Sequence, residues 1–186
     1  MRNYLLENVV EFSSNSIHSD STFIIIHKLH RTPYHIGILN NQNYFSLTIS
    51  GVEKKSFNEI VEQLEIKANN NLLVEVKSVT QPKDPLLYFI SSVLDHQHFH
   101  SCLFPIRAML ADLTSNNKLN EANNIFDLLD LLKSANLVGQ IMATRMTPMM
   151  ESKIVLIGYD NELIKKHIKR LKEKQDNEKA KDDTKK

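Results

Sequence analysis

The chain has 186 residues, a formal net charge of +1 and a hydrophobic fraction of 41%, values typical of a globular protein with one main domain. Such a balanced charge offers no electrostatic case for binding nucleic acid or an anionic membrane. A single cysteine excludes an internal disulfide. Because neither a signal-peptide core near the start nor a run of 18 apolar residues occurs, we expect a cytoplasmic protein with no membrane span.

The first half of the chain alternates strand patterns with helix patterns. Period-two alternation is clearest over Tyr44–Ser50, and together with the preceding strand pattern it predicts a hairpin over 34–50. A capping-box sequence at Ser56 and Glu59 and an Asp-Pro pair at 84–85 each predict a helix start. In chain order the predicted elements are the strands Phe23–Ile26, Tyr34–Leu39 and Tyr44–Ser50, a helix over 57–67, the strand Leu72–Val79 and a helix over 85–94.

The second half is predicted to be mainly helical. Helix patterns cover 105–114 and 120–135, with Asn120 as a cap, and another helix follows the strand Lys153–Tyr159 from Asp160. The methionines between 142 and 150 are predicted to fill core space rather than form a contact surface. From Lys172 onward almost every residue is charged or polar, which predicts a disordered tail.

These patterns predict an α+β fold with a small, mainly antiparallel sheet and packed helices. The expected organisation is a core over 1–115, a helical extension with one strand over 116–171, and the charged tail over 172–186. The sequence leaves the oligomeric state open.

The run from His96 to Cys102 is the first candidate site. Histidines alternate at 96, 98 and 100 before the cysteine, and imidazole and thiolate are ligands that Zn²⁺ accepts. In a strand, however, the four groups would span roughly 20 Å, so at most two or three could share one ion. We therefore expect solvated loop histidines and no metal, and keep a metal-binding protein as the third hypothesis.

Cys102 itself is the second candidate. Pro105, three residues later, suits the first turn of a helix, and a helix beginning there would direct its free N–H groups toward the thiol and lower the thiol pKa. His35 is the candidate base, because its apolar strand neighbours fix its orientation and Gly37 on the same face should leave space for a substrate. The alternative is a half-buried histidine hydrogen-bonded to backbone.

A family resemblance connects these residues. The segments Asp20–Ile26 and Thr32–Ile38, then Gly51-Val52 before a capped helix, resemble the circularly permuted NlpC-type papain-like superfamily, most closely its YiiX-like branch, over about residues 20–113. In that arrangement the histidine precedes a cysteine that opens a helix. The chain departs from the family pattern at Ser46, where an acid is usual, and at Leu103-Phe104, where polar residues are usual.

The resemblance implies a thiol hydrolase or acyltransferase acting on amide, isopeptide or ester bonds of a peptide or lipid-acyl substrate, without a cofactor. Cys102 would be the nucleophile, His35 the base, and Ser46 or Tyr34 would hold the imidazole, with Tyr34 and Gly37 beside the substrate. The alternative hypothesis is a catalytically inactive papain-like fold that binds a ligand or partner, favoured by Ser46 and the apolar pair after Cys102.

Overall fold

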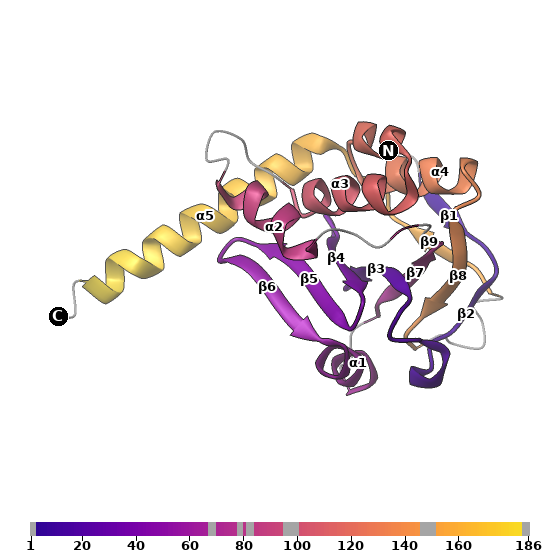
Figure 1. Ribbon diagram of the computed structural model, residues 1–186. Coiled ribbons are helices and arrows are strands. Elements are labelled where there is room, and N and C mark those ends of the chain that lie inside the picture. The colour runs from indigo at the N-terminus through magenta and orange to yellow at the C-terminus, as the bar shows by residue number, and fades with distance from the viewer. Residues whose placement is uncertain are drawn as a thin grey trace.

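The computed structural model describes residues 3–66, 70–77, 80, 84–94, 101–145 and 152–183. Its centre is a seven-stranded sheet in the order β2-β8-β7-β3-β4-β5-β6, and β1 pairs with β9 in a separate two-stranded sheet (Figure 1). All neighbouring strands are antiparallel except β2 and β8, which are parallel. The strands are β1 Tyr4–Leu6, β2 Val9–Glu11, β3 Thr22–His27, β4 His35–Asn40, β5 Asn43–Thr48, β6 Gly51–Ser56, β7 Leu72–Val76, β8 Val138–Ala143 and β9 Ile154–Leu156.

Helices cover both faces of the large sheet, so the protein has the predicted α+β class (Figure 1). On one face α3 packs against Ile36 and Ile38 of β4 in the larger core, and on the other α1 packs against Leu39 and Tyr44 in the smaller core. These two sides are called the α3 face and the α1 face below. The helices are α1 Phe57–Ile66, α2 Pro85–Leu94, α3 Leu103–Thr114, α4 Ile125–Ser134 and α5 Asn161–Asp183, with short 3₁₀ turns at Ser14–Ser16 and Asn117–Glu121.

The predicted helix starts at Ser56 and Asp84 are confirmed by their hydrogen bonds. The Ser56 N–H donates to Glu59 Oε2 at 2.8 Å, and the Glu59 N–H donates to Ser56 Oγ at 3.4 Å, so the two side chains form a reciprocal capping box. The Leu86 N–H donates to Asp84 Oδ1 at 3.0 Å. Local capping chemistry therefore sets where α1 and α2 begin.

Two features of the second half differ from the prediction. Asn124, not Asn120, caps the long helix, accepting from the N–H groups of Phe126 and Asp127, because a 3₁₀ turn occupies Asn117–Glu121. Strand β8 lies between β7 and β2, so the predicted extension contributes an interior strand to the sheet. The boundary predicted at residue 115 therefore does not separate a core from an addition.

Residues 172–183 of the predicted disordered tail instead form the second half of α5, which extends away from the body of the protein (Figure 1). Lys, Glu and Ala are good helix formers, and charge pairs one turn apart, such as Lys169 with Glu173 at 4.0 Å, support an exposed helix. The prediction of disorder was wrong because it rested on the lack of apolar residues in this segment and did not consider the helix propensity of its Lys, Glu and Ala residues.

Candidate functional site

Cys102 is the N-cap residue of α3, with φ −56° and ψ −16°, and its side chain packs against the core on the α3 face. Burial raises the pKa of the Cys102 thiol, while backbone N–H groups of Ile36, Cys102 and Leu103 act in the opposite direction. Desolvation is the larger effect. The structure thus reverses the sequence-based expectation that the helix start would lower this pKa, and it leaves a neutral thiol at neutral pH.

The N–H of Ile36 is available to the sulfur because two strands diverge there. Pairing between β4 and β5 begins at Gly37 and Ser46, so Ile36 lies beyond the last rung of the ladder on that side. The start of α3 occupies the space that the diverging strand leaves. As a result the sulfur lies where one strand N–H and two helix N–H groups converge.

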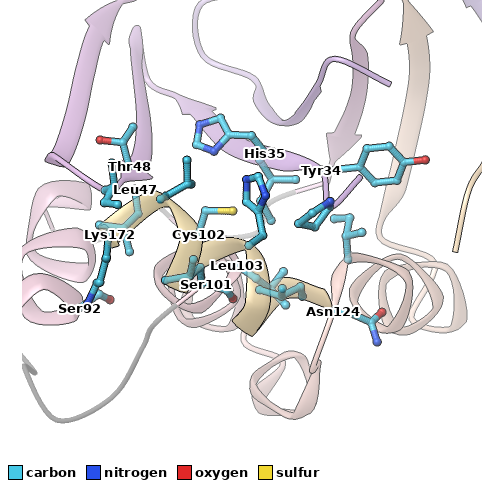
Figure 2. A pocket seen from close by; sticks show the side chains of 18 of the residues that line it. Tyr34, His35, Leu47, Thr48, Ser92, Ser101, Cys102, Leu103, Asn124 and Lys172 are labelled. Atoms are coloured by element: carbon cyan, nitrogen blue, oxygen red, sulfur yellow. The ribbon is translucent and has the colours of Figure 1, made fainter. Parts of the chain in front are cut away.

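A pocket of about 620 Å³ opens beside Cys102 (Figure 2). It lies between the diverging ends of β4 and β5, the start of α3, the end of α2 and the first half of α5. Its walls are mostly aliphatic. They include Ile36, Leu47, Ile49, Val93, Leu103, Ile125, Ile164, Ile168 and Leu171.

Several polar side chains of this pocket are hydrogen-bonded within the protein. Ser92 Oγ donates to the Tyr88 carbonyl at 2.9 Å, and Thr48 Oγ1 donates to the Gly51 carbonyl at 2.9 Å. Tyr34, proposed to contact substrate or hold the imidazole, accepts from the Ile157 N–H at 2.7 Å and packs its ring against Tyr159 at 5.4 Å. The Cys102 thiol and the N–H groups around it therefore form the main polar end of an aliphatic cavity.

His35 faces away from Cys102. Side chains alternate along β4, so Ile36 and Ile38 point to the α3 face while His35, Gly37 and Leu39 point to the α1 face. The His35 ring stacks on His27, its partner across the sheet, with ring centroids 5.6 Å apart. Figure 2 shows the imidazole directed away from the Cys102 sulfur. The sequence placed these two residues in one site, and the fold places their side chains on opposite faces of the sheet.

The space expected beside Gly37 is filled. A Cβ at Gly37 would lie 2.3 Å from the ring and hydroxyl atoms of Tyr44, whose side chain covers the glycine from the next strand. The Tyr44 hydroxyl in turn lies 2.8 Å from His27 Nε2. The glycine is needed for close packing of an aromatic ring and leaves no room for a substrate.

The acid that the sequence analysis did not find is Glu53. Ser46 is fully buried and donates from Oγ to Glu53 Oε2 at 3.0 Å, and the two residues are direct partners between β5 and β6. The tight turn that pairs Thr48 with Gly51 sets this register, so recognising Gly51–Ser56 as a strand would have located the carboxylate. The Glu53 charge raises the pKa of His35 against the larger, opposite effect of burial.

Both imidazoles on the α1 face are neutral at neutral pH. Burial lowers the pKa of His27 to about 4, with a further lowering from the nearby charge of His35, and burial also lowers the pKa of His35. They line a smaller cavity of about 370 Å³ together with Lys28, Lys55 and Glu53. This second cavity is polar, whereas the cavity beside Cys102 is aliphatic.

His167 is a pocket residue that the sequence analysis did not single out. It lies on α5 and lines the aliphatic pocket together with Cys102. Its place in a helical row with Ile164, Ile168 and Leu171 was visible in the sequence. What the sequence could not give was the packing of α5 against a cysteine about 60 residues earlier.

Within the described ranges, no group of three or more His, Cys, Asp or Glu side chains is arranged to hold a metal ion. His96, His98 and His100, and three of the predicted core methionines (Met146, Met149 and Met150), lie outside the described residues, so the metal hypothesis stays a prediction. Met142, which is described, is fully buried as predicted. Among the helices described, none has both the length and the apolar character needed to cross a bilayer.

Comparisons of the chain with protein-family models, with curated proteins and with solved structures found no match. The resemblance to the permuted NlpC-type superfamily consequently stays a prediction from short motifs, and the residues of the aliphatic pocket are the basis for inferring function.

Proposed function

We propose that this protein binds an aliphatic ligand with a small polar end, such as a single fatty-acyl chain, in the pocket beside Cys102. A volume of about 620 Å³ is within the usual range for small-molecule sites, and the walls are mainly Ile, Leu and Val side chains. This pocket is the observation that carries the proposal. It corresponds to the alternative in which a papain-like fold binds a ligand without catalysis.

The polar end of the pocket suits a carbonyl or carboxyl group. Backbone N–H groups of Ile36, Cys102 and Leu103 converge there. N–H groups at a helix start stabilise a partial or full negative charge on a ligand by donating hydrogen bonds to it. Three polar side chains of the lining, Ser92, Thr48 and Tyr34, are hydrogen-bonded within the protein and are not available to a ligand. A ligand with many polar groups would leave them unpaired, which disfavours sugars and peptides.

The test is titration with a fluorescent single-chain fatty acid, followed by displacement with an unlabelled one. Ile168→Trp should fill the cavity from α5 and weaken binding by about tenfold or more, since the chain would lose most of its buried apolar area. Val155→Trp is the matched control, because Val155 is 56% exposed on β9 and does not line the pocket. Undetectable binding by the unmodified protein, or equal binding by both variants, would refute the proposal.

A thiol hydrolase or acyltransferase is the second candidate function. The same N–H groups could stabilise an oxyanion while the Cys102 sulfur attacks an ester or amide carbonyl, a base takes the thiol proton, and the alcohol or amine leaves a thioester behind. His35 is the base predicted from the sequence, and His167 of α5 is a second histidine in the lining of the pocket.

Iodoacetamide labelling separates the two functions. A binding protein should label Cys102 at no more than about a tenth of the rate of a free thiol, because burial raises the thiol pKa and limits access. A hydrolase should label fast at about pH 6 and form an acyl adduct with an activated ester. Loss of that reactivity in His167→Ala but not His35→Ala would identify the base.

A further inference from the structure

The two halves of α5 differ sharply in charge. Residues 161–174 carry six basic and two acidic side chains, a net charge of +4, whereas residues 175–183 carry two basic and four acidic side chains, a net charge of −2. The net charge of +1 for the whole chain conceals this local concentration. The basic half is the one that lies against the pocket, because Ile164, Ile168 and Leu171 are among the pocket walls.

The basic half of α5 is amphipathic. Ile164, Ile168 and Leu171 recur at spacings of four and three and form one stripe, and the basic side chains flank it. At 100° per residue, Lys165, Lys169 and Lys172 lie on one side of the stripe, and Arg170 and Lys174 lie on the other. Ile164 and Ile168 are half-buried and line the pocket, while Leu171 stays exposed together with the flanking Lys and Arg side chains. Rows of Lys and Arg beside an exposed apolar side chain are typical of helices that lie against an anionic membrane.

A second, independent observation lies on neighbouring elements. Helix α2 lies next to the end of the β5–β6 hairpin and to α5 (Figure 1). Large apolar side chains stay exposed along α2 and among the residues that line the pocket. We call them the apolar rim. They are Ile49 (37% exposed), Leu87 (58%), Ile90 (39%), Val93 (38%) and Leu171 (39%).

We propose that the apolar rim and the basic half of α5 together dock on a membrane surface rich in anionic lipid. The aliphatic rim would enter the boundary between headgroups and acyl chains, while the flanking Lys and Arg side chains contact lipid phosphates. Three rim residues, Ile49, Val93 and Leu171, also line the pocket, so its mouth would face the membrane. Docking goes beyond the proposed binding function and does not require it.

Charge and shape favour a membrane over an acidic protein as the occupant. The rim side chains are all aliphatic, come from α2, α5 and the β5–β6 turn, and three of them line the pocket, whereas protein interfaces are usually centred on aromatic or Arg anchors. A bilayer adapts to such an uneven apolar surface. The basic residues supply the electrostatic attraction that aliphatic insertion alone lacks.

Vesicle co-sedimentation of the full chain tests this inference. We expect the protein to sediment with phosphatidylcholine vesicles that contain phosphatidylglycerol, and much less with phosphatidylcholine alone, with binding that decreases as salt is added. Lys169→Glu combined with Arg170→Glu should lower the partition coefficient by about tenfold or more. Lys118→Glu combined with Lys153→Glu makes the same charge change at exposed positions away from the rim and should have little effect.

A matched pair of neutral substitutions tests the apolar part. Leu87→Gln should weaken vesicle binding, and Val155→Gln, at a similarly exposed valine on β9, should not. Failure to sediment with the anionic vesicles, or equal binding by the two charge-reversal variants, would overturn the inference; binding to an acidic peptide without vesicle binding would assign the surface to a protein partner instead. Leu47→Trp separates this outcome from the proposed function, since it should fill the pocket from β5, block the soluble fatty acid and leave the rim, α5 and vesicle binding intact.

Discussion

The two faces of the central sheet carry the two halves of the site that the sequence had joined. On the α3 face, Cys102 lies at the end of an aliphatic cavity. On the α1 face, His27 and His35 stack beside Tyr44, Ser46 and Glu53 in a polar cluster. Neighbouring residues of one strand point to opposite faces of the sheet. Ile36 therefore points to the face that holds the Cys102 thiol, and His35, one position earlier, points to the other face.

The buried polar groups on the two faces differ in how much they need hydrogen-bond or ionic partners. The thiol is a weakly polar group whose burial costs little, so it suits an apolar pocket. The imidazoles and the carboxylate need polar partners: Glu53 is paired with Lys55 and Ser46, and His27 is hydrogen-bonded to the Tyr44 hydroxyl. The α1 face should therefore dominate the response of stability to pH, and the α3 face the response to apolar ligands.

Acidification should produce the largest effect, and it should come from the α1 face. The pKa of His27 is lowered to about 4, so between about pH 6.5 and pH 4 the unfolded chain binds a proton that the folded protein does not. The contribution of neutral His27 to the free energy of unfolding is thus fully present above this window. It is lost as the pH falls through the window, by up to about 3 kcal/mol at the lower end. Denaturant unfolding at several pH values measures this loss.

His27→Gln is the control for that measurement, because glutamine keeps a hydrogen-bonding group near Tyr44 and does not titrate. The variant should lose clearly less stability than the natural protein over the same pH range. Parallel pH curves for the two proteins would show that the histidine is not responsible.

Gly37→Ala should have the next largest effect. The new methyl group would lie 2.3 Å from atoms of the Tyr44 side chain, inside a fully buried region, so we expect a destabilisation of about 1–3 kcal/mol. Thermal or denaturant unfolding measures it. In a Tyr44→Leu background the same substitution should cost much less, since the ring is gone. Additive effects of the two substitutions would mean that the strain lies elsewhere.

Glu53→Gln should have the smallest effect on stability, below about 1 kcal/mol, because its pair with Lys55 is partly exposed to solvent. Its clearer effect is on His35. Since the Glu53 charge raises the pKa of His35, the substitution should lower that pKa further, as an NMR titration of the imidazole would show. Glu11→Gln, at an exposed position on β2, should leave the titration unchanged.

Sequence reasoning succeeded where the signal was local. The capping box at Ser56, the Asp84 cap and the alternation in β5 depend on residues only a few positions apart, and each of these elements formed where predicted. Strand β6 was missed because it is an edge strand with Lys54 and Lys55, and charged edge strands lack clear alternation.

Sequence reasoning failed where several strands had to be placed together. Strand β8 was missed because Gly139 and Gln140 interrupt its apolar pattern, although Glu75 of β7 accepts from the Gln140 N–H at 2.9 Å and lies over the glycine. The face of His35 could have been inferred from alternation, but the position of Cys102 relative to that face depends on how α3 packs. That is a long-range property which motif spacing does not contain.

The pairing of β2 with β8, and of β1 with β9, has a consequence for folding during synthesis. Residues 4–11 find their strand partners only in residues 138–156. The antiparallel group β3, β4, β5 and β6 can form from a short stretch of chain, whereas the first strands must wait until most of the protein has left the ribosome. Leu6 and Val9, both buried in the finished fold, therefore become covered only late, after the segment 138–156 has been made.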